Sequence, residues 1–259
     1  MLALVLPKLA ALALAAAPAC GLPPLRDGPR PFQPGEALGY DIDAMGVVKA
    51  GNASLALEPP IMSGTLLPIR ARFRNTSVFA KVRKARGYAL SWIDAATLRP
   101  QRYRDEGEED GVRKSTDTRL DRPGPVSMTW SIGEKKGTTT MLRQGEVLDL
   151  LSSLYYLRAA RLEPRAKICY DLVANRRFWR LRGEIAAQGE RVESAAGIFD
   201  TVRLDATLVR ADGTGPARPV HIWFSTDARR LPVAAVTEID LGPIRAMLAN
   251  VTEPGGPAN

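Results

Sequence analysis

The chain carries the run Ile69-Arg-Ala-Arg-Phe-Arg74, in which apolar residues and arginines alternate strictly. In an extended strand, successive side chains point to opposite faces, so the apolar side chains share one face and the arginines share the other. The same alternation returns in three later runs: Val202-Arg-Leu-Asp-Ala-Thr-Leu208, Val220-His-Ile-Trp-Phe224 and Val233 to Leu241. Antiparallel sheets with one side in water show this pattern. The chain is therefore predicted to be mainly β.

Turn signals separate these runs. They are Asp110-Gly111, Pro123-Gly-Pro125, Gly133, Asp212-Gly213 and Gly255-Gly256. Their spacing predicts roughly a dozen strands, as in a meander, sandwich or barrel. Residues 32–252 are long enough for one core, so we expect a single β-rich domain there. Its predicted form is a large curved antiparallel sheet or incompletely closed β-barrel, followed by a disordered tail at 253–259.

One segment, at about residues 146–160, departs from the alternation. The sequence Glu146-Val-Leu-Asp-Leu-Leu-Ser-Ser-Leu-Tyr-Tyr-Leu-Arg158 has no turn residue and repeats apolar positions at intervals of three and four. This periodicity predicts one helix that is apolar over most of its circumference and is therefore largely covered. Pro164 ends any continuation. We expect the helix to pack against the sheet or to fill the mouth of the open barrel.

The first 19 residues form an apolar leader that is typical of a secretory signal peptide and too short to span a membrane. Two cleavage sites compete. Ala17-Pro-Ala19 suits an ordinary signal peptidase, whereas the same residues with Cys20 resemble a lipoprotein box in which Cys20 is lipidated. The Pro/Gly-rich residues 20–31 favour the lipoprotein, because they suit a semi-rigid tether. We expect an exported protein of the periplasm, anchored to the outer membrane if Cys20 is acylated.

The two cysteines leave two alternatives open. If Cys20 is lipidated, Cys169 is a small buried thiol inside the run Ile168-Cys-Tyr-Asp-Leu-Val173. If Cys20 stays free, a Cys20–Cys169 disulfide can form in an oxidising periplasm. We favour the buried thiol.

The sequence offers little for catalysis. His221 is the single histidine, and there is no close cysteine pair, so zinc and iron sites of the usual kinds are nearly excluded. The common hydrolase and nucleotide-binding motifs are absent. The acidic run Asp105–Asp110 precedes a turn signal, which favours solvated acids over a calcium loop. We expect no enzyme, no metal and no cofactor, with a carboxylate-based glycan hydrolase as the remote alternative.

Basic residues form two groups on predicted strand faces. The formal net charge is +8, or +7 without the one lysine of the leader. The two groups are Arg70, Arg72 and Arg74, and Arg176, Arg177 and Arg180. One interpretation is an anionic envelope partner, such as lipid headgroups or a wall polymer. The favoured one is an ordinary wet sheet face, balanced by acids on adjacent strands. Nucleic acid is not expected as a partner of an exported protein.

Four segments together resemble a known family, the bacterial envelope proteins of domain of unknown function 3108. They are Phe32–Tyr40 (F-x-P-G-E-x-L-x-Y), Asp149–Arg158 (D-x-L-S-x-x-Y-x-x-R), Gly197–Val202 (G-x-[FY]-x-[TA]-x) and Trp223–Val233 (W-x-S-x-D-x-x-R-x-P-V). The resemblance spans about residues 32 to 250. It implies a secreted, β-rich domain in the periplasm or at the outer membrane, and it supplies no catalytic residues.

The residues of these blocks are the candidates for ligand contact or for a structural role. They are Asp149, Ser152, Tyr155, Tyr156, Arg158, Asp227 and Arg230. We favour structural roles. Asp149 in the helix's first turn offsets unpaired N–H groups, and Asp227 organises a turn in which Arg230 or Arg158 pairs with it.

The predicted architecture motivates the expected function. An open barrel with a helix on its concave side can enclose an apolar ligand, so we expect a protein that binds or helps assemble a lipid, lipoprotein or other amphipathic cargo. The alternative is a wall- or glycan-interacting structural protein that uses its basic outer face. The first expectation requires a hollow that Leu148, Leu151 and Tyr155 do not fill.

Overall fold

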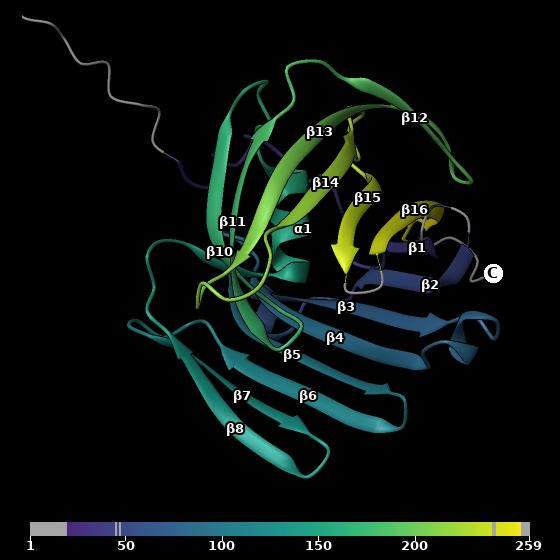
Figure 1. Ribbon diagram of the computed structural model, residues 1–259. Helices are drawn as coiled ribbons and strands as arrows, with labels where there is room; N and C mark the ends of the chain where they lie inside the picture. The colour runs from purple at the N-terminus through teal and green to yellow at the C-terminus, as the bar shows by residue number, and fades with distance from the viewer. Residues whose placement is uncertain (1–19, 45, 47, 240–241, 255–259) are drawn as a thin grey trace, which may run out of the picture.

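The structure, a computed structural model, describes residues 20–44, 46, 48–239 and 242–254 (Figure 1). The predicted leader at 1–19 and residues 255–259 of the predicted tail lie outside the described residues. Within the described part, sixteen strands and one α-helix follow each other along the chain. They are β1 Ala37–Ala44, β2 Val48–Leu57, β3 Leu66–Asn75, β4 Ala85–Asp94, β5 Pro100–Glu109, β6 Val112–Arg119, β7 Val126–Ile132, β8 Lys135–Met141, β9 Val147–Asp149, α1 Leu150–Ala159, β10 Lys167–Ala174, β11 Arg177–Ile185, β12 Glu190–Ser194, β13 Gly197–Arg210, β14 Arg218–Ser225, β15 Pro232–Ile239 and β16 Gly242–Thr252, with short 3₁₀ turns η1 Met62–Gly64 and η2 Phe79–Lys81.

All these strands belong to one sheet, in the order β8-β7-β6-β5-β4-β3-β2-β1-β16-β15-β14-β13-β11-β10-β9, with β12 paired to β13. Neighbours are antiparallel except β9 and β10. Figure 1 shows the sheet curled about α1, with β13 to β15 on one side of the helix and β3 to β8 on the other. The ends of the order, β8 and β9, do not pair with each other, so the barrel is not closed. The predicted mainly β fold, an incompletely closed barrel with one packed helix, is confirmed.

The alternation that predicted the strands also builds the core. Leu57, Ile69, Ser91, Tyr103, Thr118 and Met128 form one cross-strand row on the concave face. All six side chains are buried. The arginines of β3 lie on the face opposite to Ile69, which is the convex face of the sheet. They are Arg70, Arg72 and Arg74. A shift of the strand pairing by one residue would move the apolar side chains to the solvated face. Because one face is buried and the other is in water, the period of two fixes the register here.

The helix begins later than predicted. Its N-cap is Asp149, whose carboxylate accepts hydrogen bonds from the backbone N–H groups of Leu151 and Ser152, both at 2.9 Å. The Ser152 hydroxyl accepts in turn from the Asp149 N–H, which completes a capping box. Because this cap fixes the first turn at Leu150, residues 147–149 stay extended and pair as β9 with β10. The predicted covering of the helix is confirmed, since Leu151 and Tyr155 on the helix are buried, as is Leu148 on β9.

The amino-terminal residues 20–31 pack against the domain, where a spacer was expected. Leu22 and Leu25 contact the hydrophobic core. The backbone N–H of Arg26 donates to the carbonyl of Ala159 at 2.8 Å. Proline in such a segment fixes φ and lacks an N–H, so it can lie extended over a surface without leaving a donor unpaired.

Cys20 and Cys169 form a disulfide, which the sequence left as the less favoured alternative. The preference for a free buried thiol at Cys169 is therefore wrong in this structure. Lipidation of Cys20 is incompatible with the same bridge, because both bonds would use the Cys20 Sγ atom. The surroundings support the pairing, since Gly21 lies beside Ile168 in a parallel bridge and the Cys169 N–H donates to the Gly21 carbonyl at 3.1 Å. Among the described residues, no helix has both the length and the apolar character needed to cross a membrane.

Candidate functional site

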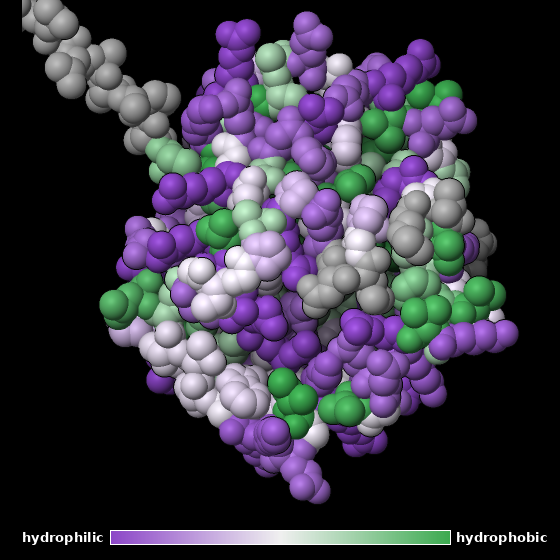
Figure 2. Space-filling view, viewed as in Figure 1, coloured by the Kyte–Doolittle hydropathy of each residue, from purple (hydrophilic) through white to green (hydrophobic). Residues whose placement is uncertain are grey.

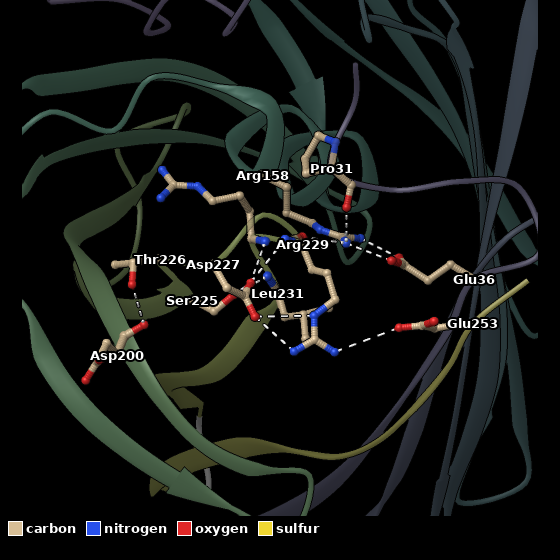
Figure 3. Close-up of polar contacts among 11 residues, drawn as sticks. Pro31, Glu36, Arg158, Asp200, Ser225, Thr226, Asp227, Arg229, Leu231 and Glu253 are labelled. Atoms are coloured by element: carbon tan, nitrogen blue, oxygen red, sulfur yellow. Dashed lines mark hydrogen bonds and ion pairs between the residues drawn. The ribbon is translucent and has the colours of Figure 1, made fainter. Parts of the chain in front are cut away.

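Arg158, in the last turn of α1, is a charged residue with a fully buried side chain. Its guanidinium binds Glu36 through two hydrogen bonds, from Nη1 to Oε1 at 2.5 Å and from Nη2 to Oε2 at 2.8 Å (Figure 3). Phe32 and Tyr155 lie against the guanidinium plane, with ring centres 5.2 and 5.0 Å from its central carbon. Two-point pairing and flanking rings are an arrangement that arginine, and not lysine, can make.

This ion pair joins the motif blocks that are far apart in the sequence. Arg158 Nη2 donates to the carbonyl of Arg229 at 3.1 Å, and that loop also holds Asp227 (Figure 3). The next residue back, Thr226, donates from its N–H and its hydroxyl to the carbonyl of Asp200 at 2.8 and 3.2 Å. Glu36, Arg158, Asp227 and Asp200 each come from a different block. The four blocks therefore meet at one place, which we call the motif hub.

The motif hub is enclosed, which fits a structural role better than ligand contact. Arg158 is fully buried and the Glu36 side chain is 8 % exposed, so neither is available to a ligand from solution. Tyr155 donates weakly toward Glu36 at 3.5 Å, and burial raises the pKa of Tyr155. Tyr156 donates to the Pro23 carbonyl at 3.1 Å and so ties down the amino-terminal segment. Glu36 was not among the candidates predicted from the sequence, although it is the single carboxylate of the F-x-P-G-E block.

Asp227 organises its turn as predicted, but its partner differs from the two arginines expected. Its carboxylate accepts from the Ser225 hydroxyl at 2.7 Å and from Arg229 Nη2 at 2.9 Å. Arg230 contributes only its backbone N–H, at 3.2 Å. Burial and the neighbouring Arg26 lower the pKa of Arg230. The prediction that Arg230 or Arg158 forms the ion pair with Asp227 is thus wrong, because the side chain of Arg229 occupies that position.

Asp149, the N-cap of α1, is a second buried acid in addition to Glu36. Its Oδ2 accepts from the Ser91 hydroxyl on β4 at 2.6 Å, while Oδ1 caps the helix. Burial raises the pKa of the Asp149 carboxyl to about 6, although the hydrogen bonds from Ser91 and Ser152 oppose this shift. The carboxylate thus joins the helix to the sheet.

We expect Asp149→Asn to change the pH dependence of stability. The folded-state pKa lies above the ordinary value of 3.8, so the folded chain holds the extra proton between about pH 4 and 6. As the pH rises through that window, the titration of Asp149 therefore lowers the free energy of unfolding by on the order of 2–3 kcal/mol. Asparagine keeps the capping oxygen and removes the titration. Urea unfolding at several pH values should show a smaller loss of stability for the variant than for the wild type.

Asp227→Asn is the matched control. Burial raises the pKa of Asp227, but the hydrogen bonds from Ser225 and Arg229 outweigh this and hold it below its ordinary value. The stability that the Asp227 carboxylate contributes is present above its pKa in the unfolded chain. It is lost as the pH falls through its pKa in the folded chain. The variant should therefore shift the pH profile in the direction opposite to Asp149→Asn. Equal profiles for the wild type and Asp149→Asn would contradict the assignment.

A groove of about 850 Å³ crosses strands β2 to β7. Most of its lining residues form two cross-strand rows on the convex face that carries Arg70, Arg72 and Arg74. The rows are Asn52–Arg74–Arg86–Glu108–Arg113 and Ser54–Arg72–Tyr88–Glu106–Ser115–Ser131. A second hollow of about 690 Å³ shares Ser115 and Ser131 and continues to Lys136 on β8. The two hollows are adjacent, and we call them together the convex groove.

The charges of the convex groove are incompletely balanced. Arg70 pairs with Glu58 beside the groove, and Arg86 pairs with Glu108 at 2.8 Å. These contacts fit the favoured interpretation of a wet face balanced by neighbouring acids. In the described part of the chain, however, the exposed side chains of Arg72, Arg74 and Arg113 make no hydrogen bond or ion pair. The groove therefore presents a net positive charge, with five cations against two acids among the residues that line its larger hollow.

The second basic group is scattered. Arg180 pairs with Asp171 at 3.5 Å. Arg176 lies at the β10–β11 turn with φ 58°. Its charge lowers the pKa of Asp105, which burial raises more strongly. Arg177 is exposed on β11. These three arginines share no hollow with the convex groove.

His221 belongs to an ion-pair network on β13 and β14. Its Nδ1 lies 2.5 Å from Oδ1 of Asp205, which also forms an ion pair with Arg203 at 2.8 Å. Trp223 donates to Glu190 at 2.7 Å, and Arg203 pairs with Glu190 as well. In residues 20–44, 46, 48–239 and 242–254, no group of three or more histidine, cysteine or carboxylate side chains could hold a metal ion.

One of three solved structures to which the chain is similar has the same overall fold. A β-barrel-like protein of domain of unknown function DUF1849 from Brucella abortus has a TM-score of 0.58 at 10 % identity, over 86 % of this chain and 98 % of that one. A predicted lipoprotein from Parabacteroides distasonis gives a TM-score of 0.38 at 8 % identity, over 88 % and 100 %. An exported-protein candidate with a YmcC-like fold from Bacteroides fragilis gives 0.33 at 8 %, over 86 % and 98 %. The first likeness supports the fold alone.

No curated protein matches the sequence. The family model of DUF3108, a protein family of unknown function, matches residues 39–249. This range includes three of the four motif blocks in full and the last residues of the first block. The chain therefore belongs to the DUF3108 family.

Proposed function

We propose that this protein is a non-enzymatic protein of the bacterial cell envelope that binds an anionic glycan or wall polymer in the convex groove. The observation that carries the proposal is the set of three exposed arginines, Arg72, Arg74 and Arg113, that line one groove and make no hydrogen bond or ion pair with the described residues. Arg72 and Arg74 lie two residues apart on β3, and Arg113 lies three strands away, in register with Arg74. Strand spacing of about 4.8 Å places Arg74 and Arg113 roughly 14 Å apart, which suits an extended polymer better than a single small anion.

The rest of the groove suits a glycan. Tyr88 lies between Arg72 and Glu106 in the second row, where its ring offers a flat apolar surface. Asn52, Ser54 and Ser115 offer hydroxyl and amide groups to sugar hydroxyls. Arginine binds carboxylate and phosphate groups through two parallel hydrogen bonds, so repeated acidic groups on a chain could be held at more than one point.

The concave side beside the helix offers less support for an apolar cargo. Leu148 and Tyr155 are fully buried, and Leu151 is 3 % exposed. These are the side chains on which room for a cargo depended. Because these side chains are buried, they present no surface to a cargo, and the cargo hypothesis is supported less well than binding in the convex groove.

The disulfide supports the proposal that the protein is exported. A bridge between Cys20 and Cys169 forms and persists in an oxidising compartment such as the periplasm, and cytosolic proteins rarely hold one. The predicted leader at residues 1–19 would deliver the chain there.

The test is calorimetric titration of the exported protein with a galacturonate hexamer and with neutral maltohexaose. We expect binding of the acidic hexamer only, and its loss by about 0.3 M salt, because contacts between exposed charges are screened. Arg72→Gln/Arg74→Gln/Arg113→Gln should weaken binding by roughly tenfold or more, as three exposed charge contacts imply.

The matched control replaces three exposed arginines outside the groove: Arg122→Gln/Arg177→Gln/Arg191→Gln. This variant loses the same net charge, so it separates binding at the groove from general attraction. Equal weakening by both triple variants, or equal binding of the neutral hexamer, would contradict the proposal.

A further inference from the structure

Three hairpins end at one rim of the sheet. The β3–β4, β5–β6 and β7–β8 connections lie together at the lower right in Figure 1. Hydrogen bonds join them: the Lys84 N–H donates to Asp110 Oδ1, and the Asp110 N–H donates to the Lys84 carbonyl, both at 2.8 Å. The Gly133 N–H donates to the Arg113 carbonyl at 2.8 Å. We call residues 78–84, 109–113 and 132–136 the hairpin rim.

Apolar side chains are exposed at all three tips of this rim. Val78 and Val82 are 65 % and 73 % exposed, and Val112 and Ile132 are 42 % and 38 % exposed. In the space-filling view, hydrophobic residues lie beside hydrophilic ones near the end of the β3–β4 hairpin (Figure 2), whereas most of this side of the molecule is hydrophilic.

The β3–β4 connection is shaped to hold its valines outward. The Arg83 N–H donates to the Phe79 carbonyl at 3.0 Å, so residues around η2 form a helical turn. Val78 and Val82 are four residues apart and therefore lie on one side of such a turn. Phe79 packs inward, against the small cluster of Ile42, Ala44 and Ala50. The inward phenylalanine anchors the turn, and the two valines project into solvent.

Positive charge surrounds these apolar groups. The hairpin rim has six lysines and arginines against three acids. Lys81, Lys84, Lys135 and Lys136 are exposed, and in the described part of the chain their ammonium groups have no hydrogen bond or ion pair. The rim acid Glu109 is already paired, with Arg83 at 3.0 Å and with Lys114.

We propose that the hairpin rim docks on an anionic lipid surface. The valines and the isoleucine would enter the boundary between headgroups and acyl chains, while the lysines contact lipid phosphates. A membrane suits this rim better than a protein partner. The apolar groups are separate and interleaved with lysines, whereas the buried centre of a protein interface is depleted of lysine. The rim shares Arg113 and Lys136 with the convex groove. The inference is tested separately, because it rests on the exposed valines and on Lys84 and Lys135, which do not line the groove.

The test is flotation of the exported protein with lipid vesicles, either neutral or with roughly 30 % phosphatidylglycerol to supply negative charge. We expect flotation with the anionic vesicles only. Lys84→Gln/Lys135→Gln should weaken partitioning by roughly 25-fold, at about 1 kcal/mol for each cation. Val78→Ser/Val82→Ser should weaken it by roughly tenfold or more.

The matched control is Ile198→Ser/Val209→Ser, on β13. These side chains are 57 % and 37 % exposed, so they remove comparable apolar surface away from the rim. This variant should float like the wild type, and circular dichroism should show all variants folded. Flotation unchanged by both rim variants would overturn the proposal, as would a wild type that stays with neither vesicle. Sedimentation that shows a dimer, dissociated by the valine substitutions, would instead assign the rim to a second copy of the chain.

Discussion

Arg158→Met is expected to lower the free energy of unfolding by about 3–5 kcal/mol, the cost of breaking a buried ion pair by removing one partner. The substitution would leave the Glu36 carboxylate charged in a nearly closed site, without the two hydrogen bonds that now satisfy it. It would also leave the carbonyls of Pro31 and Arg229 without their shared donor. Urea unfolding monitored by circular dichroism measures the loss.

Two further variants separate the pair from simple loss of an arginine. Glu36→Gln/Arg158→Met removes both charges, so it should recover part of the stability that the single variant loses. Arg161→Gln removes an arginine three residues later, from an exposed pair with Asp27, and should cost less than about 1 kcal/mol. A loss in Arg158→Met no larger than that in Arg161→Gln would show that the motif hub does not hold the fold.

The strand faces could be predicted because they depend on local alternation alone. Ile69 and Arg70 are neighbours, and burial of the first requires exposure of the second in an extended strand. The helix was predicted for the same reason, from its period of three to four. Its start was placed three or four residues too early, since Val147 and Leu148 fit either period. Only the capping hydrogen bonds of Asp149 decide that these residues form a strand.

Partners of charged residues could not be predicted, because they depend on register. The sequence grouped Arg70, Arg72 and Arg74 as equals. In the sheet, Arg70 reaches Glu58 across the β2–β3 turn, while Arg72 and Arg74 face serine and asparagine on β2. The motif hub could not be predicted from the sequence for a similar reason. Its charges, Glu36 and Arg158, are 122 residues apart, and no local period relates them.

The composition of residues 20–31 led to a wrong expectation, because the packing of this segment against the domain decides its structure. The prolines of residues 20–31 suggested a tether, but a proline-rich segment also lies well along a surface. Pro23 is buried, and its carbonyl accepts from Tyr156. The segment packs beside α1, and its first residue, Cys20, forms the disulfide. The choice between lipid anchor and bridge at Cys20 therefore depends on the fold around Cys169, which the first twenty residues cannot show.

Loss of the Cys20–Cys169 bridge is expected to lower the free energy of unfolding by about 2–5 kcal/mol, because a cross-link across a long chain segment restricts the unfolded state. The two cysteines are 149 residues apart in sequence. Cys20→Ser and Cys169→Ala each remove the same bridge, so each should cost about as much as the double variant. Urea unfolding without reductant measures all three, and the wild type treated with dithiothreitol should match them.

The same samples test the chemistry of Cys20 directly. If the bridge forms after export, the denatured wild type has no reactive thiol, and its intact mass lies two hydrogens below that of the reduced chain beginning at residue 20. An acyl mass on Cys20 together with a reactive Cys169 thiol would restore the lipoprotein interpretation. In that case the single variants would also differ, since Cys169→Ala would remove only a buried thiol and Cys20→Ser would remove the anchor. Equal costs for the two single variants therefore require that both sulfur atoms belong to one bond.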